Sequence, residues 1–278
     1  MCINGRNQRG DVNLIISSLR ILVGLVFIFC VMVVFLPLML VMIPSRRYRI
    51  YLGNAAGKLI ARAVLFLSGT EMDFAVAAES QRHYPAIYIS NHTSILDIFI
   101  GMWTAPYGVC GVAKKQVVYY PFFGLLYLLA GHLRVDRGNT AQAVEALKEV
   151  AVLMKRHNLG LWLWPEGTRS RDGKIKGFKK GFAHMALATG LPVVPVVVSG
   201  VQRAWRHGSW AIHPTKVRVQ VLDPIHPTDW TLDNLEEKVQ MVHDRMEAAL
   251  PPEQRSTSSA SALDYPETEL RMQEAPAR

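Results

Sequence analysis

The chain has 278 residues, half of them hydrophobic, and carries a net charge of +9. This length allows one good-sized globular domain plus an additional region. Cys2, Cys30 and Cys110 have a spacing that excludes a metal-binding pair and a disulfide framework. The positive charge suits an anionic membrane surface or an acidic substrate. Nucleic acid is the alternative partner, but the sequence contains no nucleic-acid-binding motif.

The first predicted element is an uncharged apolar run over residues 21–43. It is long enough to cross a bilayer core, which takes roughly 20 apolar residues. It is too long for the apolar part of a secretory signal, and no small-residue cleavage site follows it. A buried core helix is disfavoured, because such a helix rarely runs this far without a polar face. We therefore predict that residues 1–70 form an N-terminal, helical membrane anchor.

The sequence leaves open how this anchor sits in the membrane. Pro37 lies inside the run and predicts a kink or break in the helix. Arginines flank the run on both sides, so the excess of positive charge on cytoplasmic loops does not select an orientation. A second apolar stretch, residues 59–67, follows closely. A single span is possible, but a broken helical pair dipping into one leaflet would place both basic flanks on the same side.

Beyond Glu71 the predicted elements alternate between strands and helices. The predicted strands are residues 86–90, 108–113, 133–136, 159–164, 193–199 and 216–222. The predicted helices are residues 140–157, 177–189 and 234–250. This alternation implies an α/β fold, with residues 71–250 forming a layered domain around a largely parallel or mixed sheet. Residues 251–278 are rich in Pro, Gln, Ser, Glu and Ala, and we predict a disordered tail.

The motif NHTSILD, residues 91–97, follows the strand predicted at 86–90. His92 would stand at the corner between this strand and the next helix, at the sheet edge where α/β folds bind ligands. Asp97, in the first turns of that helix, could reach back to the imidazole. An aspartate bonded to one ring nitrogen fixes the tautomer and leaves the other nitrogen as a general base. By itself, such a pair is more often a structural hydrogen bond or a helix cap.

A second polar cluster, PEGTRS, follows the strand predicted at 159–164. Gly167 would let the backbone approach a ligand closely. Thr168 offers a hydroxyl, and the fork of Arg169 suits phosphate oxygens. Glu166 could accept a hydrogen bond from a substrate hydroxyl or hold Arg169 in place. The alternative interpretation is a polar turn with an arginine on the surface.

Taken in order, NHTSILD, PEGTRS and LPVVPVVVSG resemble the motifs of the lysophospholipid acyltransferase family, whose best-known members are the 1-acylglycerol-3-phosphate acyltransferases. The resemblance covers residues 86–222, and AKKQVVYYPFFGLLYLLAG, GHLRVDR and FKKG extend it. It implies that His92 is the base and that Asp97 orients it. The implied acceptor-binding residues are Lys114, Arg137, Glu166, Gly167, Thr168 and Arg169. Val194 and Pro195 would shape the acyl side. Arg134 departs from the family pattern, which leaves the acceptor headgroup open.

The resemblance also implies the reaction. A fatty acyl group would pass from acyl-CoA or acyl-carrier protein to the sn-2 hydroxyl of 1-acylglycerol-3-phosphate, giving phosphatidic acid. This chemistry needs no metal and no cofactor other than the acyl donor. One alternative is another lysolipid acceptor, such as lyso-ornithine lipid or a lysophosphoglyceride. A different alternative is a non-catalytic, membrane lipid-binding protein of the same fold. We expect a bacterial cytoplasmic (inner) membrane, with the active site on the cytoplasmic side.

Overall fold

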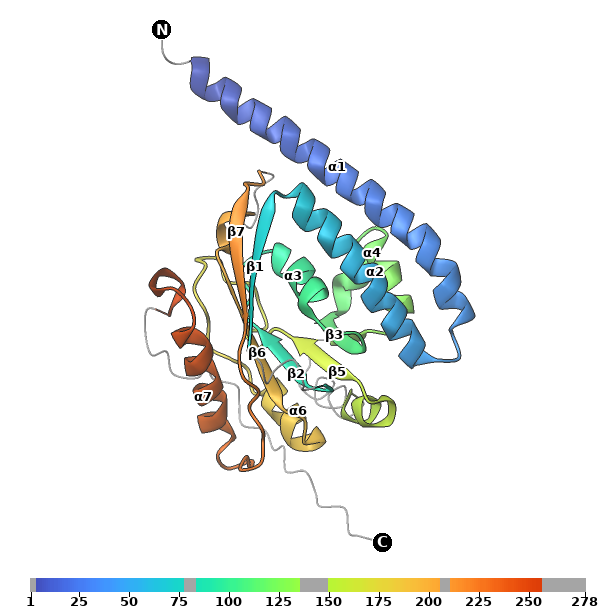
Figure 1. Ribbon diagram of the computed structural model, residues 1–278, viewed down its shortest axis with the longest axis vertical. Coiled ribbons are helices and arrows are strands. Elements are labelled where there is room, and N and C mark those ends of the chain that lie inside the picture. The colour runs from blue at the N-terminus through green and yellow to red at the C-terminus, as the bar shows by residue number, and fades with distance from the viewer. Residues whose placement is uncertain (1–3, 78–83, 136–149, 206–210, 257–278) are drawn as a thin grey trace.

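The computed structural model describes residues 4–77, 84–135, 150–205 and 211–256 (Figure 1). Its N-terminal part is a helical hairpin of α1 (Asn4–Val41) and α2 (Arg46–Leu67). Within the described residues, two helices are long and apolar enough to cross a membrane, residues 14–41 of α1 and the whole of α2. The hairpin makes α1 a candidate membrane anchor.

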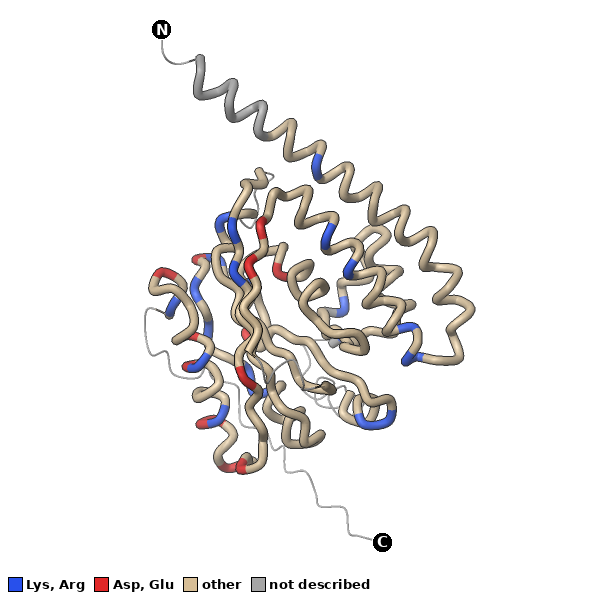
Figure 2. The backbone as a smooth tube through the Cα atoms, in the orientation of Figure 1, with Lys and Arg blue, Asp and Glu red and all other residues tan. Residues whose placement is uncertain are grey.

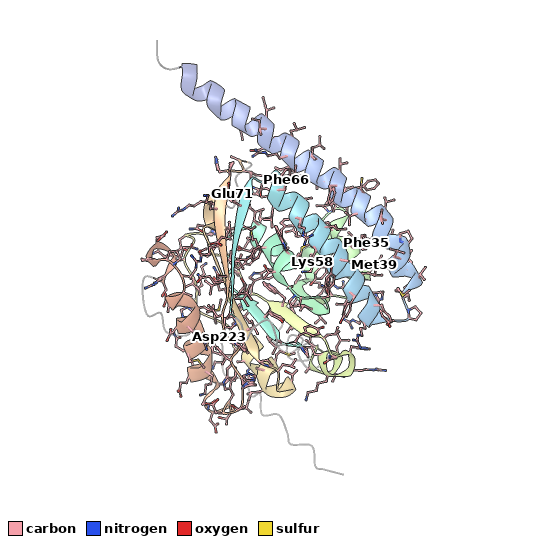
Figure 3. The ribbon with its side chains drawn as sticks, viewed as in Figure 1. Phe35, Met39, Lys58, Phe66, Glu71 and Asp223 are labelled. Carbon is pink, nitrogen blue, oxygen red and sulfur yellow. The ribbon has the colours of Figure 1, made fainter. Side chains whose placement is uncertain are left out.

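Pro37 was predicted to kink or break the first helix, and the break does not occur. α1 continues through it to Val41, and the turn comes at residues 42–44, where the amide of Ser45 donates to the carbonyl of Met42. A proline removes one main-chain donor, and in apolar surroundings the remaining backbone groups still favour pairing within the helix. Figure 3 shows Phe35 and Met39 on the side of α1 that faces α2, and Met39 is fully buried.

The centre of the fold is a seven-stranded sheet of order β1-β7-β6-β2-β5-β3-β4. Its strands are β1 (Thr70–Val76), β2 (Ile87–Ser90), β3 (Val109–Lys114), β4 (Leu133–Val135), β5 (Gly160–Leu163), β6 (Val193–Ser199) and β7 (Thr215–Val221). Only the β6–β7 ladder is antiparallel among the pairings of these strands. The prediction of an α/β fold with a largely parallel or mixed sheet is therefore confirmed.

Strand β1 was missed in the sequence. It lies at the sheet edge and pairs in parallel with β7, with Thr70 opposite Thr215. Its side chains are only partly buried, so its segment TEMDFAV lacks the strong apolar character of β6. The partner strand lies some 145 residues away in the chain. No local sequence pattern predicts a pairing between strands so far apart in the chain.

Helices cover both faces of the sheet (Figure 1). The remaining helices are α3 (Leu96–Thr104), α4 (Phe123–Leu129), a described helical segment at 150–157, α6 (Gly181–Thr189) and α7 (Leu235–Ala248). Successive side chains of a strand point to opposite faces. Accordingly, Ile87 and Ile89 join the core under α6 and α7, whereas Tyr88 between them joins the core under α3.

Two boundaries differ from the sequence prediction. Helix α6 begins at Gly181 rather than at residue 177, because the preceding chain is hydrogen-bonded to the PEGTRS turn. The amide of Lys179 donates to the carbonyl of Pro165. Residues 251–256, grouped with the tail by composition, pack on the domain, and Gln254 there is buried and accepts from the amide of Gly200. The tail beyond them lies outside the described residues.

Candidate active site

The loop that follows β2 is fixed to the centre of the sheet. Asn91 uses both ends of its side-chain amide to pair with the main chain of Val198 on β6, at 2.8 Å in each direction. Both groups are buried, so the pair satisfies polar atoms that would otherwise be costly to bury. The next residue, His92, is therefore held at the carboxyl edge of the sheet, as predicted.

His92 and Asp97 meet there. The imidazole Nδ1 lies 3.0 Å from the Asp97 Oδ2, and the side chain of His92 is 13% exposed. The same carboxylate oxygen accepts the amides of Thr93 at 2.6 Å and Ser94 at 2.7 Å. An ionised carboxylate can accept hydrogen bonds but cannot donate them. The Nδ1 of His92 therefore carries the proton that is donated to Asp97, and Nε2 is left with a free lone pair. This is the arrangement of a general base.

Glu166 connects the PEGTRS turn to this pair. Its Oε1 accepts the amide of His92 at 2.6 Å, and its Oε2 accepts the amide of Lys176 at 3.2 Å. On the other side, the amide of Ser170 donates to the carbonyl of His92 at 2.8 Å. The main chain of His92 is thus bonded to the turn through both its N–H and its C=O. The two motifs, separated by 74 residues in the sequence, form one unit.

The carboxyl group of Glu166 is buried. Burial raises its pKa from the usual 4.5 to about 8, and the hydrogen bonds from the main chain of His92 and Lys176 oppose this rise. Both of its oxygens are engaged with main-chain amides rather than pointing to solvent. The geometry therefore indicates that Glu166 fixes the main chain of His92, a role that the sequence did not suggest.

The turn itself presents a basic surface. Gly167 adopts a φ of +74°, a left-handed conformation that favours glycine. Thr168 is exposed and Arg169 is partly exposed. Arg171, Lys176 and Lys179 are exposed cations in the same stretch. Several positive charges beside His92 suit a phosphate-bearing ligand.

An apolar cavity begins next to the imidazole. The ring of Trp164 stacks on His92, with 4.8 Å between centroids and 25° between planes. Trp164 and Trp162 also line a cavity of about 130 Å³ whose other walls come from α2, α3, α4 and β3. Neither tryptophan was predicted as a site residue. The only available signal for Trp164 was its position directly before PEGTRS.

The remaining predicted residues make none of the contacts of this unit described above. Lys114 ends β3, next to Val135 of β4 in the register, and Arg137 lies outside the described residues. Arg134 on β4 is exposed. Val194 and Pro195 are buried in β6 opposite Tyr88 and Ile89, and they are absent from the lining of the cavity. Their roles stay predictions.

A layered α/β domain with a His–Asp pair beside a basic turn is the arrangement expected of an acyltransferase, and comparison with known proteins identifies this class. The family model described as Acyltransferase matches residues 73–199. A 1-acyl-sn-glycerol-3-phosphate acyltransferase of Limnanthes douglasii is 40% identical over 92% of this chain and 90% of its own length. One of the same name from Haemophilus influenzae is 32% identical over 65% of this chain and 75% of its own length.

The crystal structure of the 1-acyl-sn-glycerophosphate (LPA) acyltransferase PlsC from Thermotoga maritima has the same fold. It matches with a TM-score of 0.65 at 25% identity, over 85% of this chain and 96% of that one. The chain therefore belongs to the lysophospholipid acyltransferase family, a family of O-acyltransferases, as its motifs predicted. The relatives include plant, bacterial and nematode proteins, so they do not select the predicted bacterial inner membrane.

Proposed function

We propose that this enzyme transfers a fatty acyl group from acyl-CoA or acyl-carrier protein to the sn-2 hydroxyl of 1-acylglycerol-3-phosphate, giving phosphatidic acid. The observation that carries the proposal is the 3.0 Å contact between His92 and Asp97, which leaves the Nε2 of His92 as a base beside a basic turn. The names of the relatives support the choice of acceptor.

The reaction follows from these groups. The Nε2 of His92 takes the proton of the sn-2 hydroxyl as that oxygen attacks the thioester carbonyl carbon. The carbon–sulfur bond then breaks, and the protonated imidazole returns the proton to the departing thiolate. Asp97 holds the ring and stabilises its transient positive charge. A hydroxyl is a weak nucleophile near neutral pH, so a positioned base contributes roughly 10²–10⁴-fold to the rate.

The remaining groups bind and position. Arg169 and the neighbouring cations would hold the phosphate of the acceptor, with Thr168 as a further donor. Gly167 lets that ligand approach the main chain. Glu166 acts through His92, because its carboxyl group is engaged with main-chain amides. Since Trp164 contacts the imidazole and lines the apolar cavity, an acyl chain in that cavity would have its thioester carbon beside His92.

We further propose that the chain works on a membrane, with residues 1–70 as its anchor. Supporting this, many apolar side chains of α1 are exposed along its length, Ile15 and Val41 among them. Helix α2 packs on α3 of the catalytic layer, so α1 lies along the domain rather than extending away from it. Because α1 is unbroken from Asn4 to Val41, the predicted broken helical pair is not formed, and we propose instead that α1 lies along one face of the membrane. Thiol labelling of Cys2 and of a Ser45→Cys variant should then occur from the same face of the membrane.

Substitution of His92 tests the assignment of the base. We expect His92→Ala to lose roughly 10²–10⁴-fold in turnover while it unfolds at the parental temperature. A matched control is His213→Ala, because His213 is an exposed histidine that precedes β7. Steady-state kinetics with purified enzyme and a labelled acyl thioester provide the measurement. Turnover of His92→Ala at the parental rate would show that another group is the base.

The acceptor is tested separately with a panel of lysolipids. The parent enzyme and one labelled acyl thioester are compared on 1-acylglycerol-3-phosphate, lyso-ornithine lipid and lysophosphoglycerides. We expect labelled phosphatidic acid as the main product. Preferential acylation of another lysolipid would replace the acceptor and keep the chemistry. Failure to acylate any of them would favour the non-catalytic, lipid-binding alternative.

A further inference from the structure

The segment that connects β3 to β4 has an apolar outer surface. It comprises the 3₁₀ helix η2 (Lys115–Tyr119), a short loop and α4. Tyr119 is 81% exposed and Tyr120 is 59% exposed, although large aromatic side chains are usually at least partly covered. The exposed large hydrophobic residues of this segment, which we name the α4 surface, are Tyr119, Tyr120, Phe122, Leu125 and Leu128.

The fold holds this surface in a strained but ordered conformation. Phe122 has a φ of +61°, which is a rare and unfavourable conformation for a bulky residue. The main chain around it is bonded, with the amide of Gly124 donating to the carbonyl of Tyr120 at 2.9 Å. A side chain at Gly124 would collide with the carbonyl of Val118. The exposed aromatic residues therefore belong to a defined structure.

The α4 surface continues the outer face of α1. The Phe122 ring meets Phe29 of α1 edge-to-face, with 5.1 Å between centroids. Beneath this contact, Leu126 of α4 packs into one core cluster with Ile28 and Met39 of α1. Residues 21–43 and 119–129 are both uncharged. Figure 2 shows that Lys and Arg of the described residues lie on the rest of the molecule and at the ends of this region.

We propose that the α4 surface inserts into a phospholipid bilayer beside α1, as a second membrane-contacting element. The occupant is a bilayer rather than a protein because the surface is continuous with an apolar run long enough to match a bilayer core. Tyrosines prefer the boundary between lipid and water. The exposed Lys115, at the edge of the surface, would meet anionic headgroups.

This insertion would place lipid directly against the wall of the cavity. The inner side of the same segment contributes Val117, Phe123, Leu126 and Tyr127 to the cavity lining. A single layer of chain therefore separates the outer α4 surface from the space next to Trp164. If the proposed acyl transfer is correct, an acyl chain can leave the bilayer at this point. The insertion itself does not rest on the proposed reaction.

Labels on the full-length protein test the insertion. In a background with its three cysteines replaced by serine, single variants Tyr119→Cys and Leu125→Cys carry an NBD fluorophore. Val34→Cys on the exposed side of α1 is the positive control, and Met241→Cys on α7 is the control for exposed apolar positions elsewhere. The protein is reconstituted into phosphatidylcholine–phosphatidylglycerol vesicles with or without doxyl-labelled lipid. Thermal unfolding verifies that each variant is folded.

We expect the labels at 119, 125 and 34 to shift to shorter wavelength and to be quenched by doxyl lipid, and the label at 241 to stay quenchable by aqueous iodide. Labels at 119 and 125 that iodide reaches, while 34 is quenched by lipid, would overturn the proposal. So would labels protected from both quenchers, because these would show a second copy of the chain on the surface. Neither readout uses enzyme activity, so the result is independent of the proposed reaction.

Discussion

At the scale of single residues, Asp97 combines two tasks. Its Oδ2 accepts one hydrogen bond from the imidazole and two from main-chain amides, so the carboxylate shapes the loop as well as the base. An asparagine at this position has one acceptor oxygen and an amide that donates. We therefore expect Asp97→Asn to allow the wrong tautomer of His92 and to lower turnover by roughly 10²–10⁴-fold.

A double variant shows whether Asp97 acts through His92. If it does, His92→Ala/Asp97→Asn should be no slower than His92→Ala alone, because residues that work as a unit are strongly non-additive. Steady-state kinetics of the two single variants and the double variant measure this. Multiplicative losses would indicate that Asp97 contributes to the reaction independently of the imidazole.

Glu166 makes stability depend on pH. In the folded state its pKa is about 8, above the usual 4.5, so between these values the folded protein keeps a proton that the unfolded chain releases. Its contribution to stability is therefore complete below about pH 4.5 and is lost as the pH rises to 8, with a slope of at most about 1.4 kcal/mol per pH unit. Above pH 8 the loss levels off.

The Glu166→Gln variant tests this sign. Glutamine does not titrate, so the free energy of unfolding of the parent, measured relative to the variant, should fall from pH 5 to pH 8. Denaturant unfolding in detergent micelles at several pH values gives this difference. A difference that is constant over the range, or that grows with pH, would contradict the burial-driven pKa.

At the scale of secondary structure elements, α2 is bonded to the helices of the α/β domain through polar side chains. Arg46 and Arg49 donate to the carbonyls of Gly131 and Leu129 after and within α4. Lys58 of α2, labelled in Figure 3, likewise donates to main-chain carbonyls of a neighbouring helix end. These contacts satisfy carbonyl groups at the ends of helices, which lack partners within the helix. They also fix the hairpin relative to the helices it covers.

Lys58 is the contact with the clearest test. Its Nζ donates to the carbonyls of Trp103 and Ala105 at 2.6 Å each, at the C-terminal end of α3, whose first turn holds Asp97. We expect Lys58→Met to destabilise the fold by about 1.5–3 kcal/mol, because charge-assisted hydrogen bonds are lost and buried carbonyls remain. The control Lys155→Met changes an exposed lysine. Equal free energies of unfolding for the two variants would contradict this role.

At the scale of the whole molecule, apolar and charged surfaces are separated. The outer face of α1 is apolar, whereas charged residues concentrate around the sheet and α7 (Figure 2). Two forces of different salt dependence should therefore hold the protein on a membrane. Electrostatic attraction acts over about 10 Å at 0.1 M salt and about 3 Å at 1 M, whereas apolar burial is not screened.

Vesicle flotation separates the two contributions. On neutral phosphatidylcholine vesicles, we expect binding to persist at about 1 M salt, because α1 supplies it. On vesicles that also contain phosphatidylglycerol, the additional affinity should disappear as salt is raised from about 0.1 M to 1 M. Release from neutral vesicles at high salt would show that charge rather than α1 anchors the chain.

The sequence by itself determined the features that depend on short-range patterns. The apolar run at 21–43 and the alternation of strands and helices follow from composition and periodicity. The contact between His92 and Asp97 is also a short-range feature. The two residues are five positions apart, between the end of a strand and the start of a helix, where the chain has few possible conformations. Local steric and hydrogen-bonding rules fix such features wherever the segment folds.

Only the tertiary structure decided the contacts between distant segments. Examples are the pairing of β1 with β7, the stacking of Trp164 on His92, and the bond from the His92 amide to Glu166. The hydrogen bonding of residues 174–179 to the PEGTRS turn, because of which α6 begins only at Gly181, is another such long-range contact. Each of these depends on how the sheet brings its strands together, because burying apolar side chains on both faces outweighs the local preference of any one segment.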